Sequence, residues 1–68
     1  MSVAKVTEIT SSSTTSFDDA VKNGLARANK TLAGIKGAWI QEMTVDCDKE
    51  GEIKEYRVNM KVTFLLKD

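Results

Sequence analysis

The most recognisable spacing of metal-binding residues lies in the segment Asp46–Gly51, which reads Asp-Cys-Asp-Lys-Glu-Gly. Acids at its first, third and fifth positions and glycine at its sixth match the opening of a calcium-binding loop. That loop also needs a bidentate glutamate at its twelfth position, where this chain has Arg57. We therefore predict a solvated acidic turn, with a weak divalent-cation site at Asp46, Asp48 and Glu50 as the alternative. Acids that gather at a symmetry axis of an oligomer could also bind a cation jointly.

Residues suited to catalysis are scarce. The chain has no histidine, no nucleophile elbow and no glycine-rich phosphate loop. Cys47, the only cysteine, has no basic partner in the sequence pattern, so we expect an unreactive packed thiol. The hydroxyl-rich run Ser11–Ser16 also lacks a base that could activate it. The sequence therefore argues against an enzyme.

Composition and charge exclude several classes of partner. Ten basic and ten acidic residues give no net charge, whereas a sequence-independent grip on nucleic acid needs a concentrated basic surface. The chain has no run of about 18 apolar residues, the length needed to span a membrane. Its N-terminus lacks the apolar stretch of a signal peptide. Together with the single cysteine, these features predict a cytoplasmic protein that binds neither nucleic acid nor membrane.

The length of 68 residues predicts one domain, residues 1–68. The core of so short a chain rarely supplies more than roughly 3–5 kcal/mol of stability without reinforcement. One cysteine rules out a disulfide within the chain, and the lack of histidine argues against a zinc site. We therefore expect the missing stability to come from association between copies.

The first expected elements are a strand, a polar loop and a helix. The strand covers residues 3–10, and the run Ser11–Ser16 forms the loop, with a hydroxyl-rich anion site as the alternative. Ser16 is the expected N-cap of the helix and Gly34 its stop. Apolar residues recur along the helix at three- and four-residue spacing, which predicts one buried stripe. The stripe consists of Phe17, Ala20, Val21, Gly24, Leu25, Ala28 and Leu32.

A long hairpin follows. Its first strand covers residues 38–47, and its alternation of apolar and polar residues is blurred, which predicts that both faces are partly buried. One face should carry Trp39, Met43, Val45 and Cys47, and the other Ala38 and Ile40. A turn at residues 49–52 uses Gly51 for its positive φ. The last strand covers residues 53–66, with an apolar face toward the helix and a polar face toward a partner or a lumen.

Several segments resemble the dodecin family over nearly the whole chain without a gap. They are Val3-Ala4-Lys5-Val6 with Glu8, Ser16-Phe17-Asp18-Asp19-Ala20-Val21, Leu25-Ala26-Arg27-Ala28, Lys30-Thr31-Leu32, Tyr56-Arg57-Val58 and Met60-Lys61-Val62-Thr63-Phe64. The resemblance implies an α+β fold of order β-α-β-β, in which a three-stranded antiparallel sheet wraps one helix. It also implies that twelve copies assemble as a hollow homo-oligomer.

The resemblance further implies a flavin-binding function. In that family, flavins stack in pairs at subunit junctions, where they are stored or sequestered rather than turned over. An indole offers the flat isoalloxazine a stacking face worth roughly 0.5–1.5 kcal/mol beyond burial. Leaving the polar edge of the ring buried and unpaired would cost roughly 1–3 kcal/mol. The expected ligand is FMN or riboflavin, and the alternative is a flavin-free assembly or an ion- or anion-binding module.

The expected flavin contacts depart from the pattern of the family. Ungapped comparison puts Gly37 at the place of the stacking tryptophan, with Trp39 two residues later, and Arg57 at the place of a flavin-edge glutamine. Either the helix–strand loop is two residues longer and Trp39 stacks on the flavin, or this branch has lost the flavin pair. In the second case Trp39 packs at a subunit contact. Because Gly37, Trp39 and Gln41 share strand parity, they and Arg57 are the candidate cofactor-binding residues.

Arg57 supports two interpretations. Its planar guanidinium could bind phosphate, which would favour FMN or another nucleotide-like anion over riboflavin. Alternatively, Arg57 forms a salt bridge with Glu55 or with an acid of the preceding strand such as Glu42.

Overall fold

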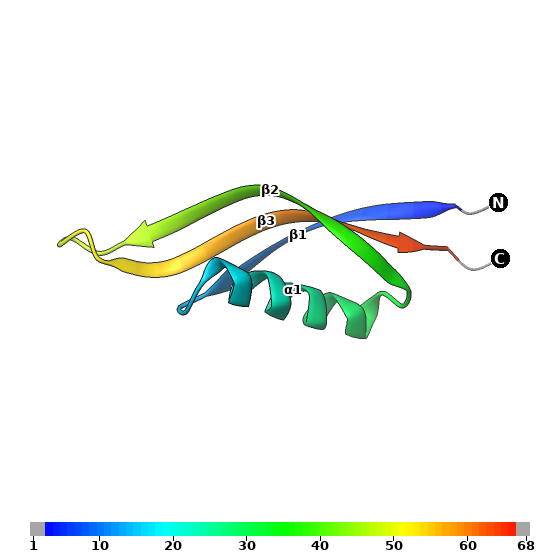
Figure 1. Cartoon of the computed structure of the whole chain (residues 1–68), viewed down its shortest axis with the longest axis horizontal. Helices are drawn as coiled ribbons and strands as arrows, with labels where there is room; N and C mark the ends of the chain where they lie inside the picture. The colour runs from blue at the N-terminus through cyan, green and yellow to red at the C-terminus, as the bar shows by residue number, and fades with distance from the viewer. Residues whose placement is uncertain (1–2, 67–68) are drawn as a thin grey trace.

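The computed structural model describes residues 3–66, which form a strand, a helix and a long hairpin (Figure 1). The elements are β1 (Ala4–Ser13), α1 (Phe17–Thr31), β2 (Ile35–Cys47) and β3 (Ile53–Leu65). The strands pair antiparallel in the order β1-β3-β2, so β3 is central and the other two strands are edges. The β-α-β-β architecture predicted from the sequence is confirmed. Within residues 3–66, no helix has the length and hydropathy required to cross a membrane.

Capping groups define both ends of α1. Ser16 has an extended backbone, and its Oγ accepts a hydrogen bond from the amide of Asp19 at 3.0 Å. This bond satisfies one of the amides that lack a partner in the first turn. Asp18 and Asp19 lie in that turn, where the helix dipole favours negative charge. Gly34 follows the helix with a φ of 81°, a conformation that favours glycine. The predicted N-cap is therefore confirmed. The helix ends earlier than predicted, at Thr31 with Leu32 as its C-cap, and Gly34 lies in the turn that follows.

The serine run is only partly a loop, which corrects the expectation from the sequence. Strand β1 continues through Ser13, and Ser11 and Ser12 pair with β3. The buried Ser13 hydroxyl donates to Asp19 Oδ2 at 2.7 Å and accepts from the amide of Thr15 at 2.9 Å. Because this hydroxyl bonds both the helix and the turn, the chain reverses within residues 14–16.

Strand β2 begins at residue 35 rather than 38 and carries an irregularity near its middle. Ile40 lies opposite Met60 and Glu42 lies opposite Asn59, so Gln41 is an extra residue without a partner. Such an extra residue is a β-bulge. Because the side chains of a strand alternate between the two faces, the bulge shifts the alternation by one residue.

The bulge corrects the predicted faces of β2. Directly opposed residues of an antiparallel pair project from the same face. Met43 and Val45 lie opposite Val58 and Tyr56, on the helix side of the sheet, whereas Trp39 belongs to the other side. The blurred alternation in the sequence therefore reflects the bulge as well as partial burial.

The core lies between α1 and the central strand. Four residues are fully buried: Ala20, Val58, Met60 and Val62. Six partly buried apolar residues pack around them: Ile9, Phe17, Val21, Leu25, Ile35 and Ile40. The predicted apolar face of β3 is thus confirmed. Gly24 permits the close approach of helix and sheet, because a Cβ there would lie 2.6 Å from Met60 Cε and 2.8 Å from Ser11 Cβ.

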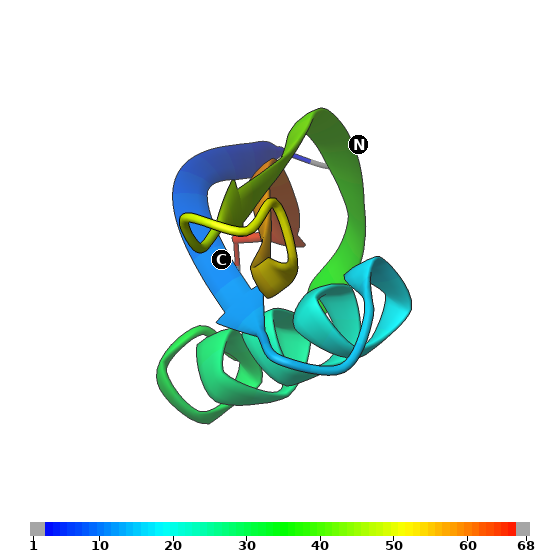
Figure 2. The same cartoon turned by 90° about the vertical axis from the view of Figure 1, so that its left-hand side faces the viewer.

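One subunit leaves much apolar surface uncovered. It measures 52 × 19 × 14 Å, and the β2–β3 hairpin projects beyond the start of the helix (Figure 1). Figure 2 shows α1 against one side of the curved strands. Cys47, expected to be packed, is exposed. Seven large apolar side chains are at least 40% exposed: Val3, Val6, Trp39, Met43, Val45, Ile53 and Leu66. Exposure on this scale supports the expected association between copies.

Candidate functional site

The sheet face opposite the helix, which we call the outer face, carries the candidate residues. Its members follow from the pairing register, because directly opposed residues share a face. Strand β3 contributes Glu55, Arg57, Asn59, Lys61 and Thr63; β2 contributes Gly37, Trp39, Glu42, Thr44 and Asp46; β1 contributes Val6, Glu8, Thr10 and Ser12. Most of this surface is polar, so the indole of Trp39 stands out on it.

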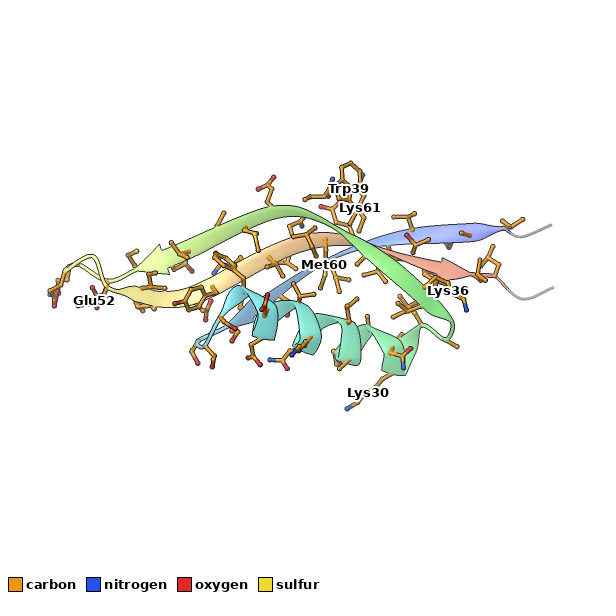
Figure 3. All side chains as sticks on the ribbon, viewed as in Figure 1. Lys30, Lys36, Trp39, Glu52, Met60 and Lys61 are labelled. Atoms are coloured by element: carbon orange, nitrogen blue, oxygen red, sulfur yellow. The ribbon has the colours of Figure 1, made fainter. Side chains whose placement is uncertain are left out.

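Trp39 is 63% exposed on the outer face. Across the sheet it meets Lys61, the directly opposed residue of β3, whose Nζ lies 5.6 Å from the centre of the indole ring. This distance allows a cation–π attraction, worth about 0.5–1 kcal/mol at an exposed site. Figure 3 shows both side chains pointing away from the helix, whereas Met60 points toward it. An indole presented in this way can stack against another flat ring.

The other two candidates on β2 flank Trp39 in the sequence. Gly37 lies opposite Thr63 on the outer face, and a Cβ placed on it would meet no atom within 4 Å. The indole therefore has open space beside it. Gln41 is the exposed bulged residue, outside the pairing register. The predicted common parity thus holds for Gly37 and Trp39 but is wrong for Gln41, because the bulge interrupts the alternation.

Arg57 is held by two carboxylates. Its Nη1 and Nη2 donate to Asp46 Oδ1 and Oδ2 at 3.1 and 2.5 Å, and Nη2 also donates to Glu55 Oε1 at 3.2 Å. The predicted salt bridge with Glu55 is confirmed, but the partner on β2 is Asp46 rather than Glu42. Asp46 lies directly opposite Glu55. A guanidinium turned toward that pair therefore bonds both carboxylates at once.

These contacts leave Arg57 poorly suited to attract an anion. The hydrogen bond to Asp46 raises the pKa of Arg57 above its already high ordinary value, as do the charges of Asp46 and Glu55, while desolvation opposes them. One cation bonded to two carboxylates leaves an excess negative charge. Arg57 also lies four residues from Lys61 along β3, or about 13 Å at 3.3 Å per residue. Within one subunit, Trp39 and Arg57 therefore do not flank the same ring.

The acidic segment after β2 forms a turn whose carboxylates are partly used. Asp48 Oδ1 accepts hydrogen bonds from the amides of Glu50 and Glu52, each at 2.9 Å. Gly51 supplies a φ of 82°, as predicted, and Asp46 is engaged in the salt bridge described above. In the described part of the chain, no three acidic, cysteine or histidine residues are grouped to hold a metal ion. The hairpin thus has the predicted acidic turn.

A shallow concavity of about 260 Å³ opens on the outer face. Its lining comprises Glu8, Thr10, Glu42, Thr44, Arg57 and Asn59. The amide of Asn59 donates to Thr10 Oγ1 at 3.2 Å. The ion pairs found within residues 3–66 all belong to Arg57, so Glu8 and Glu42 have unpaired carboxylates there.

Comparison with known proteins matches this architecture. The Dodecin family model matches residues 3–67. Dodecin from Streptomyces davaonensis superposes with a TM-score of 0.93 at 31% identity, covering 98% of this chain and 97% of that one. A variant of the Thermus thermophilus dodecin gives 0.92 at 31% identity over 100% of both chains. Comparison with curated proteins gives no significant match.

A third solved relative differs in its described ligand. Calcium dodecin from Mycobacterium tuberculosis, a calcium-chelating antigen with a calcium-binding site, superposes with a TM-score of 0.82 at 31% identity. The alignment covers 96% of this chain and 91% of that one.

A three-stranded antiparallel sheet around one helix, with apolar surface left open on both sides, defines a small α+β subunit that associates with its own copies. The chain belongs to the dodecin family, as its resemblance to dodecins predicted.

Lys61 is the residue of this site that the sequence reasoning missed. It lies within the predicted last strand, but nothing in the sequence linked it to Trp39. The link is the register of the hairpin, in which the two residues are directly opposed. Cys47 and Ile53 are the pair next to the hairpin turn. Counting the same number of residues along both strands from this pair leads to Trp39 and Lys61, because one extra residue on β3 and one on β2 cancel.

Proposed function

We propose that this dodecin binds a flavin and stores or sequesters it at a subunit junction of a dodecameric shell. Trp39 provides the stacking surface. The observation that carries the proposal is the 63% exposure of that indole on the sheet face that the subunit's own helix leaves uncovered. Burying an aromatic side chain of this size is strongly favourable, so a ligand or a neighbouring copy that covers it gains that free energy. Membership of the dodecin family favours a flavin as the flat ligand.

The neighbouring residues suit a stacked ring. Gly37 leaves open space beside the indole. Gln41 presents an amide that can both donate to and accept from the polar edge of isoalloxazine. Arg57 is too far along the sheet to reach the same ring, so its contact with the ligand would come from a second subunit. The proposed role requires no acid, base or nucleophile, which agrees with a binding protein rather than an enzyme.

Flavin fluorescence tests the proposal directly. Titrating the purified protein into FMN or riboflavin should quench the emission until all of the flavin is bound, because a stacked indole is close enough to donate an electron to the excited isoalloxazine and take it back without emission. Trp39→Ala should abolish most of the quenching while the mass measured by size-exclusion chromatography stays that of the assembly. Met43→Ala is the matched control, since this side chain is also exposed, on the same strand, but faces the helix side.

Two results would contradict the proposal. Wild-type protein at micromolar concentration could leave the fluorescence of both flavins unchanged. Alternatively, Trp39→Ala could break the assembly to the same extent that it lowers flavin binding. The second result would show that Trp39 is an interface residue and would favour the flavin-free alternative.

A second candidate function is binding of a divalent cation, favoured by the 31% identity with the calcium dodecin of Mycobacterium tuberculosis. Asp46 and Asp48 already accept hydrogen bonds. We infer that the oxygen atoms that ligate the cation would come from the unpaired carboxylates of Glu8 and Glu42 and the hydroxyls of Thr10 and Thr44. Such oxygen donors suit calcium.

Calcium binding is measured by isothermal titration calorimetry on protein pretreated with a chelator, with magnesium as the comparison ion. Heat of binding that is lost in Glu42→Gln but kept in Glu50→Gln would support the outer-face donors. The same heat lost only in Glu50→Gln would place the cation in the acidic turn instead.

A further inference from the structure

A lysine beside the proposed stacking residue has a charge available for a ligand. Lys61 Nζ lies 5.6 Å from the centre of the Trp39 indole. The ion pairs of residues 3–66 all belong to Arg57, so Lys61 has no carboxylate bound to it in the described part of the chain. Its ammonium is held instead by the face of the ring.

We propose that Lys61 recognises the phosphate of a phosphorylated flavin stacked on Trp39, so that the site prefers FMN to riboflavin. The inference rests on the proposed function and names its ligand more closely. It moves phosphate recognition away from Arg57, whose guanidinium is bonded to Asp46 and Glu55.

The position of the ammonium makes binding sensitive to ligand charge. Stacked aromatic rings have centroids about 4.5–7 Å apart. The ammonium, at 5.6 Å from the indole centre, lies at the same separation from the ring as a stacked ligand would. A ligand ring that stacks on this side of the indole therefore pushes the Lys61 ammonium to the edge of the ligand ring. A phosphate on the ligand can then bond to the displaced charge, whereas riboflavin has only neutral hydroxyls to offer.

The rest of the outer face sets the direction in which the phosphate extends. Glu8 lies directly opposite Lys61 on β1, and Glu42 lies on β2 toward the hairpin tip, so carboxylates would repel phosphate both from the β1 edge and from the tip. Toward the other end of the sheet lies the opposed pair Gly37 and Thr63. Gly37 leaves space there, and the Thr63 hydroxyl is a second donor.

The lost cation–π contact and the gained phosphate contact together predict a difference in affinity between FMN and riboflavin that a binding measurement can resolve. Displacing an exposed cation–π contact weakens any stacked ligand by about two- to fivefold. A charge-assisted hydrogen bond more than offsets this loss for a phosphorylated ligand. We expect FMN to bind about tenfold more tightly than riboflavin, with the difference shrinking as salt screens the exposed charges.

The experiment compares the dissociation constants of FMN and riboflavin, measured by fluorescence quenching, in wild-type protein and three variants. Lys61→Gln should reduce the ratio of the two constants to about one. Riboflavin should bind this variant about two- to fivefold more tightly than the wild type, because no cation–π contact has to be displaced. Lys61→Arg should keep the preference, because it keeps the charge. Lys30→Gln, which makes the same change on the helix away from Trp39 (Figure 3), should keep the wild-type ratio.

Size-exclusion chromatography confirms that each variant assembles. Equal affinities of the wild type for the two flavins would refute the role of Lys61 and leave the flavin-binding function standing. A tenfold preference that survives in Lys61→Gln would also refute it. Absence of quenching by either flavin would instead overturn the proposed function together with this inference.

Discussion

Replacing Gly24 by alanine tests how closely the helix and sheet approach each other. Alanine is the better helix former by about 1 kcal/mol, so an uncrowded helix would become more stable. At this position the added Cβ would lie 2.6 Å from Met60 Cε, 2.8 Å from Ser11 Cβ and 3.1 Å from Ser11 Oγ. The methionine methyl can move, but its side chain is fully buried, and the serine Cβ is fixed to β1.

Overpacking of a core costs typically about 1–3 kcal/mol, which exceeds the gain in helix propensity. We therefore expect Gly24→Ala to lower the free energy of unfolding by about 1 kcal/mol. That loss corresponds to a fall in Tm of about 4–8 °C for a domain of this size. Circular dichroism at one fixed subunit concentration measures it, since association makes Tm depend on concentration.

The same substitution at Gly37 is the matched control. Its Cβ would meet nothing within 4 Å, and alanine restricts the unfolded chain more than glycine does, so Gly37→Ala should leave Tm unchanged or raise it slightly. If Gly24→Ala raised Tm as much as the control, helix and sheet would not be in the close contact described, and the account of Gly24 would be wrong.

Three further predictions concern the core, the helix cap and the salt bridge. Met60→Ala should cost about 2–5 kcal/mol, because the side chain is fully buried; loss of the folded assembly in chromatography checks it. Ser16→Ala should cost about 1 kcal/mol, because it removes the bond to the Asp19 amide, and thermal unfolding measures the loss. Arg57→Gln should lower Tm at low salt and less at high salt. Because the pKa of Arg57 is raised, its stabilising effect is complete below the ordinary pKa and is lost only above it. The Tm difference for Arg57→Gln should therefore stay constant from neutral pH to about pH 10, and a decline within that range would contradict the assignment.

Local patterns in the sequence predicted the helix and the central strand well. Ser16 and the acids after it mark the start of α1, and Gly34 marks the turn that follows its end, because caps and turns depend on residues close in the chain. The alternation of β3 was read correctly because its central stretch carries no bulge. The end of β1 was misplaced because Ser13 is buried by a bond to the helix residue Asp19, six positions later, which no local pattern reveals.

The candidate site was only partly predictable for a similar reason. Trp39 was identified by its residue type, and Arg57 by its place in the family pattern. Their partners depend on the register between two strands, which a single bulged residue changes. Gln41 shifts the pairing so that Arg57 lies opposite Thr44 and bonds to Asp46, whereas Glu42 was the expected acid. Bulges have no firm sequence signature, so this part of the site required the structure.

The bulge at Gln41 also explains why one subunit has two separate apolar surfaces. With regular alternation, Trp39, Met43 and Val45 would share one face, and a single partner could cover all three. The shifted register leaves Trp39 on the outer face and sends the other two to the helix side, at a part of the hairpin where both remain at least 40% exposed. Surfaces on opposite faces of one sheet cannot be buried by the same flat contact. Each subunit therefore presents two separate apolar surfaces, and we expect association between copies to use more than one kind of contact.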